Sequence, residues 1–265
     1  MIPISDNLPT LKTPVVTYAL VAVTVAVWLL YQGAGLNEVA LASSVCNLGM
    51  VPGELTRDAP LNQAIPMVRD AATGQVLSCV VDNLPINVVT PLTSMFLHGS
   101  WGHILANMLF FWVFGNNVED SMGHVRFLAF YLLCGLAAAA THVFLNPASP
   151  IPTVGASGAI SGIMGAYLLL YPRARVRMLF FFILIFFREF PAWLVLVWWF
   201  ALQVLTGLPE LMTINREASG GVAVWAHVGG FVAGAALVKL FARPRLVEAH
   251  RQAHGVRYGH GWRGL

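Results

Sequence analysis

Two glycine-rich stretches decide how the chain folds: Thr153-Val-Gly-Ala-Ser-Gly-Ala-Ile-Ser-Gly162 and Trp225-Ala-His-Val-Gly-Gly-Phe-Val-Ala-Gly234. Each carries two glycines four residues apart in an apolar run, namely Gly158 with Gly162 and Gly230 with Gly234. In membrane helices, small residues at this spacing let two backbones approach closely. The sequence therefore predicts that the helix carrying Ser157 crosses the helix carrying His227 at short distance.

The composition places the whole chain in a membrane class. Of its 265 residues, 57% are hydrophobic and only 10% are charged. A soluble domain carries about 25% charged residues, so this chain lacks the polar side chains to cover a water-exposed surface. This excludes an ordinary cytosolic enzyme and a disordered protein. The net charge of +3 gives no sign of a nucleic-acid partner.

Six apolar segments are candidate membrane helices, although several are shorter than the roughly 20 residues that a bilayer requires. They are about Val15–Tyr31, His103–Asn117, Val125–Leu145, Gly155–Tyr171, Pro191–Leu205 and Val222–Phe241. No alternating pattern supports a barrel, so helices are the expected element. The predicted fold is an all-α membrane protein with a bundle of six transmembrane helices. Its expected parts are an N-terminal segment at 1–14, a membrane domain at 15–241 with a long first outer loop at 32–91, and a basic tail at 242–265.

The basic residues predict the orientation of this bundle. With six spans and a cytoplasmic N-terminus, twelve of the 15 Lys and Arg residues fall on the inner side. Only Arg57, Arg69 and Arg216 fall on the outer side. Cytoplasmic loops carry the excess of Lys and Arg, so we expect both termini in the cytoplasm and a protein of the cell inner or plasma membrane.

One further apolar segment, Met178–Phe187, has only ten residues. As a helix it would rise about 15 Å, which is too little to cross a bilayer. We expect this segment to be interfacial or re-entrant.

Two of the three cysteines, Cys46 and Cys79, lie in the predicted outer loop, whereas Cys134 lies inside a span. Because an outer face can be oxidising, a Cys46–Cys79 disulfide is a hypothesis, with two unpaired thiols as the equal alternative. The tail holds His250, His254 and His260. We expect it to be solvated or to lie on the lipid surface rather than to bind a metal.

Polar residues inside membrane spans are costly, so Ser157 and His227 are functional candidates. Both lie near the outer end of helices that run from outside to inside. A close crossing would bring the Ser157 hydroxyl within reach of the His227 imidazole, as a nucleophile and its base require. The N-terminus of the Ser157 helix also offers free N–H groups to an oxyanion. Taken singly, helix packing explains the serine and a structural role explains the histidine.

A third polar pair, His103 and Asn107, lies one helical turn apart and therefore on one face. Both side chains are suitable donors to an oxyanion, although hydrogen bonding between helices is an equal alternative. The three spans that carry these residues run in the same direction. The four side chains therefore share one predicted depth, and together they form the set required for acyl transfer.

Other protease mechanisms fit the sequence less well. No Asp or Glu occupies the outer half of a span, so we expect a Ser–His dyad without a buried acid. There is no His-Glu-x-x-His zinc motif, and the only lysines, Lys12 and Lys239, lie on the inner side. His142 is a competing base, but it lacks flanking glycines and is interpreted as interfacial.

These residues closely resemble the rhomboid family of intramembrane serine proteases, over roughly residues 90–241. The resemblance is carried by Gly155-Ala-Ser157-Gly158, Ala226-His227-x-x-Gly230-x-x-x-Gly234 and His98…His103-x-x-x-Asn107, with Gly115-Asn-Asn-Val-Glu119, Gly123, Tyr171-Pro-Arg-Ala-Arg175 and Pro191-Ala-Trp-Leu-Val195. It implies a six-helix bundle around a cavity open to the outside. It also implies that Ser157 is the nucleophile and His227 the base, and that no cofactor or metal is required.

The resemblance further implies an oxyanion and substrate-binding site, formed by His103, Asn107, Gly155, Ala156 and the Ser157 N–H. The fifth helix would be a lateral gate and Leu208–Gly221 a cap loop. The implied partners are single-span membrane proteins with helix-breaking residues near the cut. The chain departs from some members at Ile86-Asn87, where they carry Trp-Arg, and at Ser161, where they carry an aromatic residue that stacks on the histidine.

The predicted function is intramembrane endopeptidase activity through a Ser157–His227 dyad. One alternative is a non-proteolytic rhomboid-like binder or chaperone of membrane helices, against which the intact Ser–His pair argues. Another is a small transporter or channel, against which the shared depth of the polar residues and the lack of an inverted repeat argue.

Overall fold

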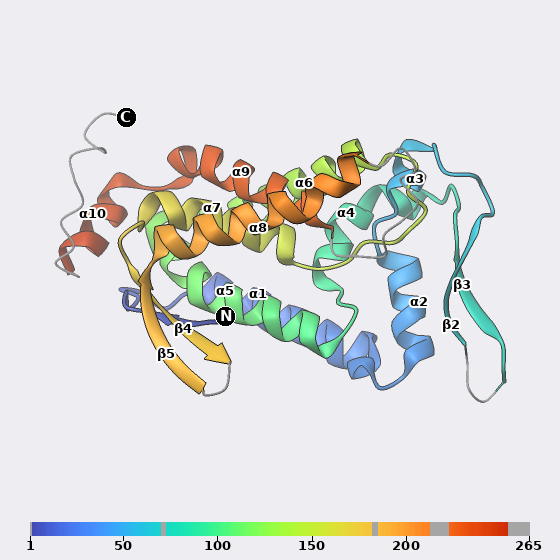
Figure 1. Cartoon of the computed structure of the whole chain (residues 1–265), viewed down its shortest axis with the longest axis horizontal. Helices are drawn as coiled ribbons and strands as arrows, with labels where there is room; N and C mark the ends of the chain where they lie inside the picture. The colour runs from blue at the N-terminus through green and yellow to red at the C-terminus, as the bar shows by residue number, and fades with distance from the viewer. Residues whose placement is uncertain (1, 70–72, 182–184, 213–222, 254–265) are drawn as a thin grey trace.

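The computed structural model describes residues 2–69, 73–181, 185–212 and 223–253. Its long helices run side by side and its two β-hairpins lie at opposite ends of the bundle (Figure 1). The helices are α1 (Val15–Ala26), α2 (Glu38–Leu48), α3 (Pro52–Thr56), α4 (Thr90–Thr93), α5 (Trp101–Met122), α6 (His124–Leu145), α7 (Ser157–Leu170), α8 (Ala192–Met212), α9 (Val224–Phe241) and α10 (Pro244–Ala253). The strands are β1 (Ile2–Asp6), β2 (Ala64–Arg69), β3 (Val76–Val80), β4 (Arg175–Phe181) and β5 (Ile185–Pro191).

Helices stand at all six apolar segments that the sequence singled out. α1 continues through a π-helical turn, Val27–Tyr31, and the other five are α5 to α9. Three of them, α6, α9 and the Ala192–Pro209 part of α8, are long and apolar enough to cross a bilayer. The crossing of the membrane by all six stays a prediction. α8 also extends to Met212, into the expected cap loop, and the rest of that loop lies outside the described residues.

The core is centred on α7, which packs against α5, α6 and α9. Most of its side chains are buried, including Ile163 and Tyr167, neither of which is exposed at all. Tyr167 packs edge-on against Phe114 of α5, with 5.0 Å between the ring centroids. Apolar contacts on every side therefore fix the position of α7 and of the serine at its first residue.

The α7–α9 crossing has almost no room between the backbones. A Cβ added to Gly230 would lie 2.0 Å from the carbonyl oxygen of Gly158. One added to Gly234 would lie 1.9 Å from that of Gly162. The predicted close crossing is confirmed, and the absence of side chains at Gly230 and Gly234 makes it possible. A side chain at Gly158 or Gly162 would instead meet Ala138 or Cys134 of α6.

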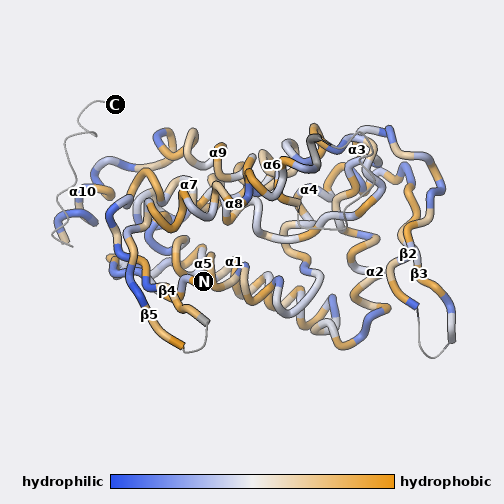
Figure 2. The backbone as a smooth tube through the Cα atoms, viewed as in Figure 1, coloured by the Kyte–Doolittle hydropathy of each residue, from blue (hydrophilic) through white to orange (hydrophobic). Residues whose placement is uncertain are grey.

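The described residues of the segment Met178–Phe187 belong to strands, which the sequence interpretation did not foresee. β4 and β5 form an antiparallel hairpin in which Arg177 faces Glu189, and β1 joins β4 to complete a three-stranded sheet. Arg175 and Arg177 are exposed on β4, whereas Val176 between them is buried. Figure 2 shows hydrophobic residues toward the end of the hairpin. Its interfacial position stays a prediction, and residues 182–184 are outside the described part.

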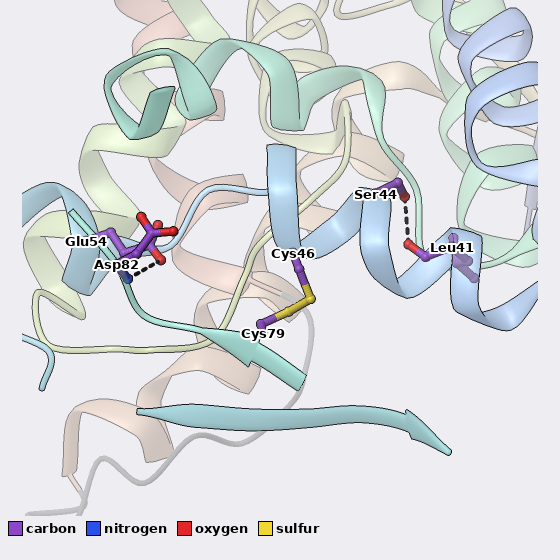
Figure 3. The surroundings of a disulfide bond; sticks show 6 residues. All are labelled: Leu41, Ser44, Cys46, Glu54, Cys79 and Asp82. Atoms are coloured by element: carbon purple, nitrogen blue, oxygen red, sulfur yellow. Dashed lines mark hydrogen bonds between the residues drawn. A yellow bond between two sulfur atoms is a disulfide. The ribbon is translucent and has the colours of Figure 1, made fainter. Parts of the chain in front are cut away.

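The predicted outer loop, 32–91, is folded rather than extended. Cys46 at the C-terminal part of α2 is bonded to Cys79 of β3, with 4.9 Å between their Cα atoms (Figure 3). The disulfide hypothesis thus agrees with the structure, while Cys134 is free and buried. At the position of the departure noted above, Asn87 donates to Oδ1 of Asp82 over 2.8 Å and provides a local anchor for the loop.

The tail is not wholly solvated, contrary to expectation. Its first part forms α10, in which Val247 and His250 are buried. Nε2 of His250 lies 3.0 Å from Oδ1 of Asn117 on α5. The helix therefore packs on the end of the bundle where the β1–β4–β5 sheet lies (Figure 1). His254 and His260 lie outside the described residues.

Candidate active site

Ser157 is held at the first turn of α7 by an extended loop. The loop is tied down by the paired backbones of Thr153 and Met50, and by the N–H of Gly155, which donates to the carbonyl oxygen of Ser94 over 2.9 Å. Gly155 has φ +128°, a region that L-residues with side chains rarely adopt. The turn at Gly155 places the serine at the N-terminus of the helix, where the first backbone N–H groups have no acceptor within the helix and the potential is positive.

His227 approaches Ser157 from the first turn of α9. Its Nε2 lies 2.7 Å from Oγ of Ser157, which is hydrogen-bonding distance. Only 8% of the histidine is exposed. The close helix crossing thus brings the two predicted side chains together. This contact is the geometry that a nucleophile and its general base require.

A cavity of about 870 Å³ opens beside this pair. Its walls come from α5 to α9, from the loop before α7 and from the segment before α5, and they include Ser157, His227, His103, Asn107 and Gly155. The structure therefore places all four polar candidates at one cavity. The sixth predicted position, Ala156, is different because its side chain is fully buried in the core and does not line the cavity.

Asn107 carries an unused hydrogen-bond donor. It is only 6% exposed, and its Nδ2 has no hydrogen-bond partner within the described part of the chain. Leaving a buried donor unpaired is unfavourable, so such groups in native proteins call for an explanation. His103, on the same face of α5, faces Gly155, where an added Cβ would lie 2.7 Å from its Nε2. The two side chains border the space beside Ser157.

His98 supports the position of His103 from the segment before α5. It is fully buried, and its ring packs edge-on against that of His103 with 5.0 Å between the centroids. Burial lowers the pKa of His98 to about 3; the neighbouring His103 acts in the same direction and the Phe96 carbonyl opposes it. His98 is therefore neutral over the physiological pH range. Its backbone is fixed by Gln32, which bonds both its N–H and its carbonyl.

His142, the competing base, also lines the cavity. Its Nε2 lies 3.2 Å from the hydroxyl of Thr153. The histidine at 2.7 Å from Ser157 is instead His227. Ser161, one turn after Ser157, bonds back to the Ser157 carbonyl over 2.7 Å, so it has a local helical partner.

The sequence interpretation missed two residues of α8 that contact the histidine. Oε1 of Gln203 lies 2.8 Å from Nδ1 of His227. The ring of Trp199 lies 5.9 Å from the imidazole, at 38° to its plane. The expected dyad therefore has a third polar neighbour. A lone glutamine in an apolar helix forms no motif, and its only signal was its polarity at a depth where polar groups are costly.

The family model for the rhomboid domain matches residues 86–244, more than half of the chain. The chain belongs to the rhomboid family. The match contains all four polar candidates at the cavity: Ser157, His227, His103 and Asn107. In the described residues, no cluster of His, Cys, Asp and Glu is arranged to hold a metal ion.

Several curated rhomboid proteins are similar over part of their length. The chain is 44% identical to the Rhomboid protease GluP of Bacillus subtilis over 78 residues, covering 29% of this chain and 15% of that protein. It is 29% identical to the mitochondrial RHOMBOID-like protein 12 of Arabidopsis thaliana over 157 residues, covering 53% and 43%. It is 31% identical to the Rhomboid-like protease 5 of Toxoplasma gondii over 167 residues, covering 59% and 16%. The matches thus span less than half of each relative.

Proposed function

We propose that this rhomboid protein is an intramembrane serine endopeptidase that cleaves single-span membrane proteins. The observation that carries the proposal is the 2.7 Å contact between Oγ of Ser157 and Nε2 of His227 at the wall of a cavity. The unpaired Nδ2 of Asn107 beside the same cavity supports it. Two relatives bear the name of protease, and the proposal extends that activity to this chain.

In the proposed reaction, His227 accepts the hydroxyl proton at Nε2 while Oγ attacks the scissile carbonyl carbon. The negative charge that develops on the carbonyl oxygen is stabilised by Nδ2 of Asn107, by His103 and by the Ser157 N–H. His227 then donates the proton to the leaving amine as the carbon–nitrogen bond breaks. Water in the cavity hydrolyses the acyl-enzyme, with His227 again as base.

The substrate must expose a backbone carbonyl to this site. In a helix that carbonyl is hydrogen-bonded, so a transmembrane substrate has to unwind locally before attack. Gly or Pro near the cut lowers the free energy of unwinding. We therefore propose substrates with such residues at the outer end of their span, and a chain with six spans and both termini in the cytoplasm.

The test is cleavage of a tagged single-span reporter by purified protein in vesicles, with Ser157→Ala as the matched variant. We expect cleavage by the wild type and none by Ser157→Ala, with equal thermal stability. A fluorophosphonate should label the wild type at Ser157 only. If the wild type binds the reporter, cleaves none of it and takes up no fluorophosphonate, the non-proteolytic binder is the correct function.

A further inference from the structure

The imidazole of His227 is held by α8 as well as by its own helix. Nε2 faces Oγ of Ser157 at 2.7 Å, and Nδ1 faces Oε1 of Gln203 at 2.8 Å. The two ring nitrogens thus have one partner each, from two different helices. To act as a base, the ring has to accept the serine proton at Nε2, so its own proton must be on Nδ1. The Gln203 amide must then turn its oxygen, and not its NH2 group, toward Nδ1.

With its amide oxygen toward Nδ1, as in this structure, Gln203 pairs with that tautomer. An oxygen can only accept, so the 2.8 Å contact requires the proton on Nδ1 and leaves the lone pair on Nε2 for the serine. A donor at this position would impose the opposite tautomer and remove the base. Unlike a carboxylate, the amide adds no negative charge to the site.

Trp199 adds a second contact from the same face of α8. It lies four residues before Gln203, and its ring packs against the imidazole at 5.9 Å. It also packs against Phe231, one turn beyond His227 on α9. Trp198 and Leu205, which also lie on α8, are more than half exposed. Gln203 and Trp199 are thus the two side chains of α8 that contact the histidine in the described residues.

We propose that Gln203 is the positioning residue of His227, so that catalysis requires α8 in the place that it has in this structure. This inference rests on the proposed protease function. A movement of α8 that admits a substrate would separate Gln203 from His227 and leave the ring free to rotate or to change tautomer. Attack by Ser157 then requires α8 to return after the substrate has entered.

The experiment compares three variants of the full chain in vesicles: Gln203→Leu, Gln203→Glu and, as the matched control, Thr206→Val. Thr206 lies on the same helix, and within the described residues its hydroxyl bonds to the backbone carbonyls of Leu202 and Gln203, so its replacement is also polar to apolar but leaves His227 untouched. Two rates are measured: labelling by a small fluorophosphonate, which needs only the cavity, and cleavage of a single-span reporter. Thermal stability is recorded for each variant.

For Gln203→Leu we expect both the labelling rate and kcat to fall roughly tenfold to a hundredfold, with little change in KM. Gln203→Glu keeps an acceptor for the Nδ1 proton and should retain most of the labelling. Thr206→Val should match the wild type. Unchanged labelling and kcat in folded Gln203→Leu would overturn the inference and leave the protease function intact. Faster cleavage with unchanged labelling would also overturn it, because Gln203 would then only restrain α8.

The wild type provides a test that does not depend on how the variants fold. In ¹⁵N-histidine-labelled protein, the spectrum minus that of His227→Asn isolates the His227 ring. We expect the proton on Nδ1. A ring with its proton on Nε2 would overturn the inference. A wild type with neither labelling nor cleavage would instead overturn the proposed protease function.

Discussion

Gly155 leaves open a space directly beside His103: a Cβ at residue 155 would lie 2.7 Å from Nε2 of that histidine and 3.6 Å from Oγ of Ser157. The missing side chain thus borders both the proposed nucleophile and a proposed oxyanion donor. The backbone there also has φ +128°, which side-chain-bearing residues rarely adopt. Glycine is therefore required both for this backbone conformation and for the space beside His103.

Gly155→Ala should therefore lower fluorophosphonate labelling by about a hundredfold or more, the scale for loss of one oxyanion donor. The methyl group displaces His103 or shifts the loop. The control is Gly99→Ala, since an added Cβ there meets no atom within 4 Å. Equal labelling of Gly155→Ala and Gly99→Ala would show that this space is not part of the site.

Asn107→Ala should lower kcat by about 10²- to 10³-fold with a small change in KM. It should not lower thermal stability, because Nδ2 has no hydrogen bond to lose. Asn117→Ala, on the same helix, is the matched control. Nδ2 of Asn117 donates to Asp6 over 2.7 Å, so this variant should lose about 1–3 kcal/mol of stability and keep its kcat. A pure rise in KM for Asn107→Ala would contradict the oxyanion role.

Gly230→Ala should separate α7 from α9, because the new Cβ would lie 2.0 Å from the Gly158 carbonyl oxygen. Overpacking of this kind costs about 1–3 kcal/mol, and the separation lengthens the Ser157–His227 contact. Melting temperature and labelling rate should both fall. At Gly229 an added Cβ would lie 2.2 Å from Oγ1 and 2.5 Å from Cβ of Thr141 on α6, so Gly229→Ala strains the α6–α9 contact instead and should lower the labelling rate less. A larger fall in labelling rate for Gly229→Ala than for Gly230→Ala would argue against the close crossing of α7 and α9.

Reduction of the Cys46–Cys79 bond should loosen the segment 32–91. The bond joins residues 33 positions apart, and in the chain-entropy account such a loop is worth about 4 kcal/mol at most. Purified protein should migrate differently on reducing and non-reducing gels, and only Cys134 should react with an alkylating agent after unfolding without reductant. Alkylation of all three thiols would show that the bond does not form in the membrane.

The buried His98 should make the protein sensitive to acid. Its pKa is about 3 in the folded chain, whereas an unfolded histidine titrates near 6.5. Between these values the unfolded state binds the extra proton, so stability present above pH 6.5 is progressively lost as the pH falls toward 3. Melting temperatures of His98→Phe should fall less steeply over this window than those of the wild type. If the melting temperatures of the two proteins fell equally with pH, the lowered pKa of His98 would be refuted.

The sequence predicted those parts of the fold that depend on residues spaced regularly along one helix. The helix crossing was predicted from two pairs of glycines whose spacing places each pair on one helical face: Gly158 with Gly162 and Gly230 with Gly234. The crossing in turn brings Ser157 to His227. His103 and Asn107 were found through their i,i+4 spacing. All of these signals lie in the residues themselves and need no knowledge of distant partners.

The features that were missed depend on partners remote in the chain. Arg175 and Arg177 alternate with buried Val176, which is typical of a strand, but the arginines were used to orient the bundle and, for Arg175, to support the family resemblance. Gln203 acquires a role only because α8 lies against His227. His250 was assigned to a polar tail because nothing near it in the sequence reveals its contact with Asn117.

The pairing of β1 with β4 has a consequence for biosynthesis. Ile2 is the partner of Leu179, so the hydrogen bonds of the first strand cannot form until the chain has emerged from the ribosome as far as β4. Four of the six helices at the apolar segments, α1, α5, α6 and α7, are made in that interval. The sheet is thus a late event in maturation, and chains halted before residue 175 would display an unmatched strand that quality-control factors could recognise.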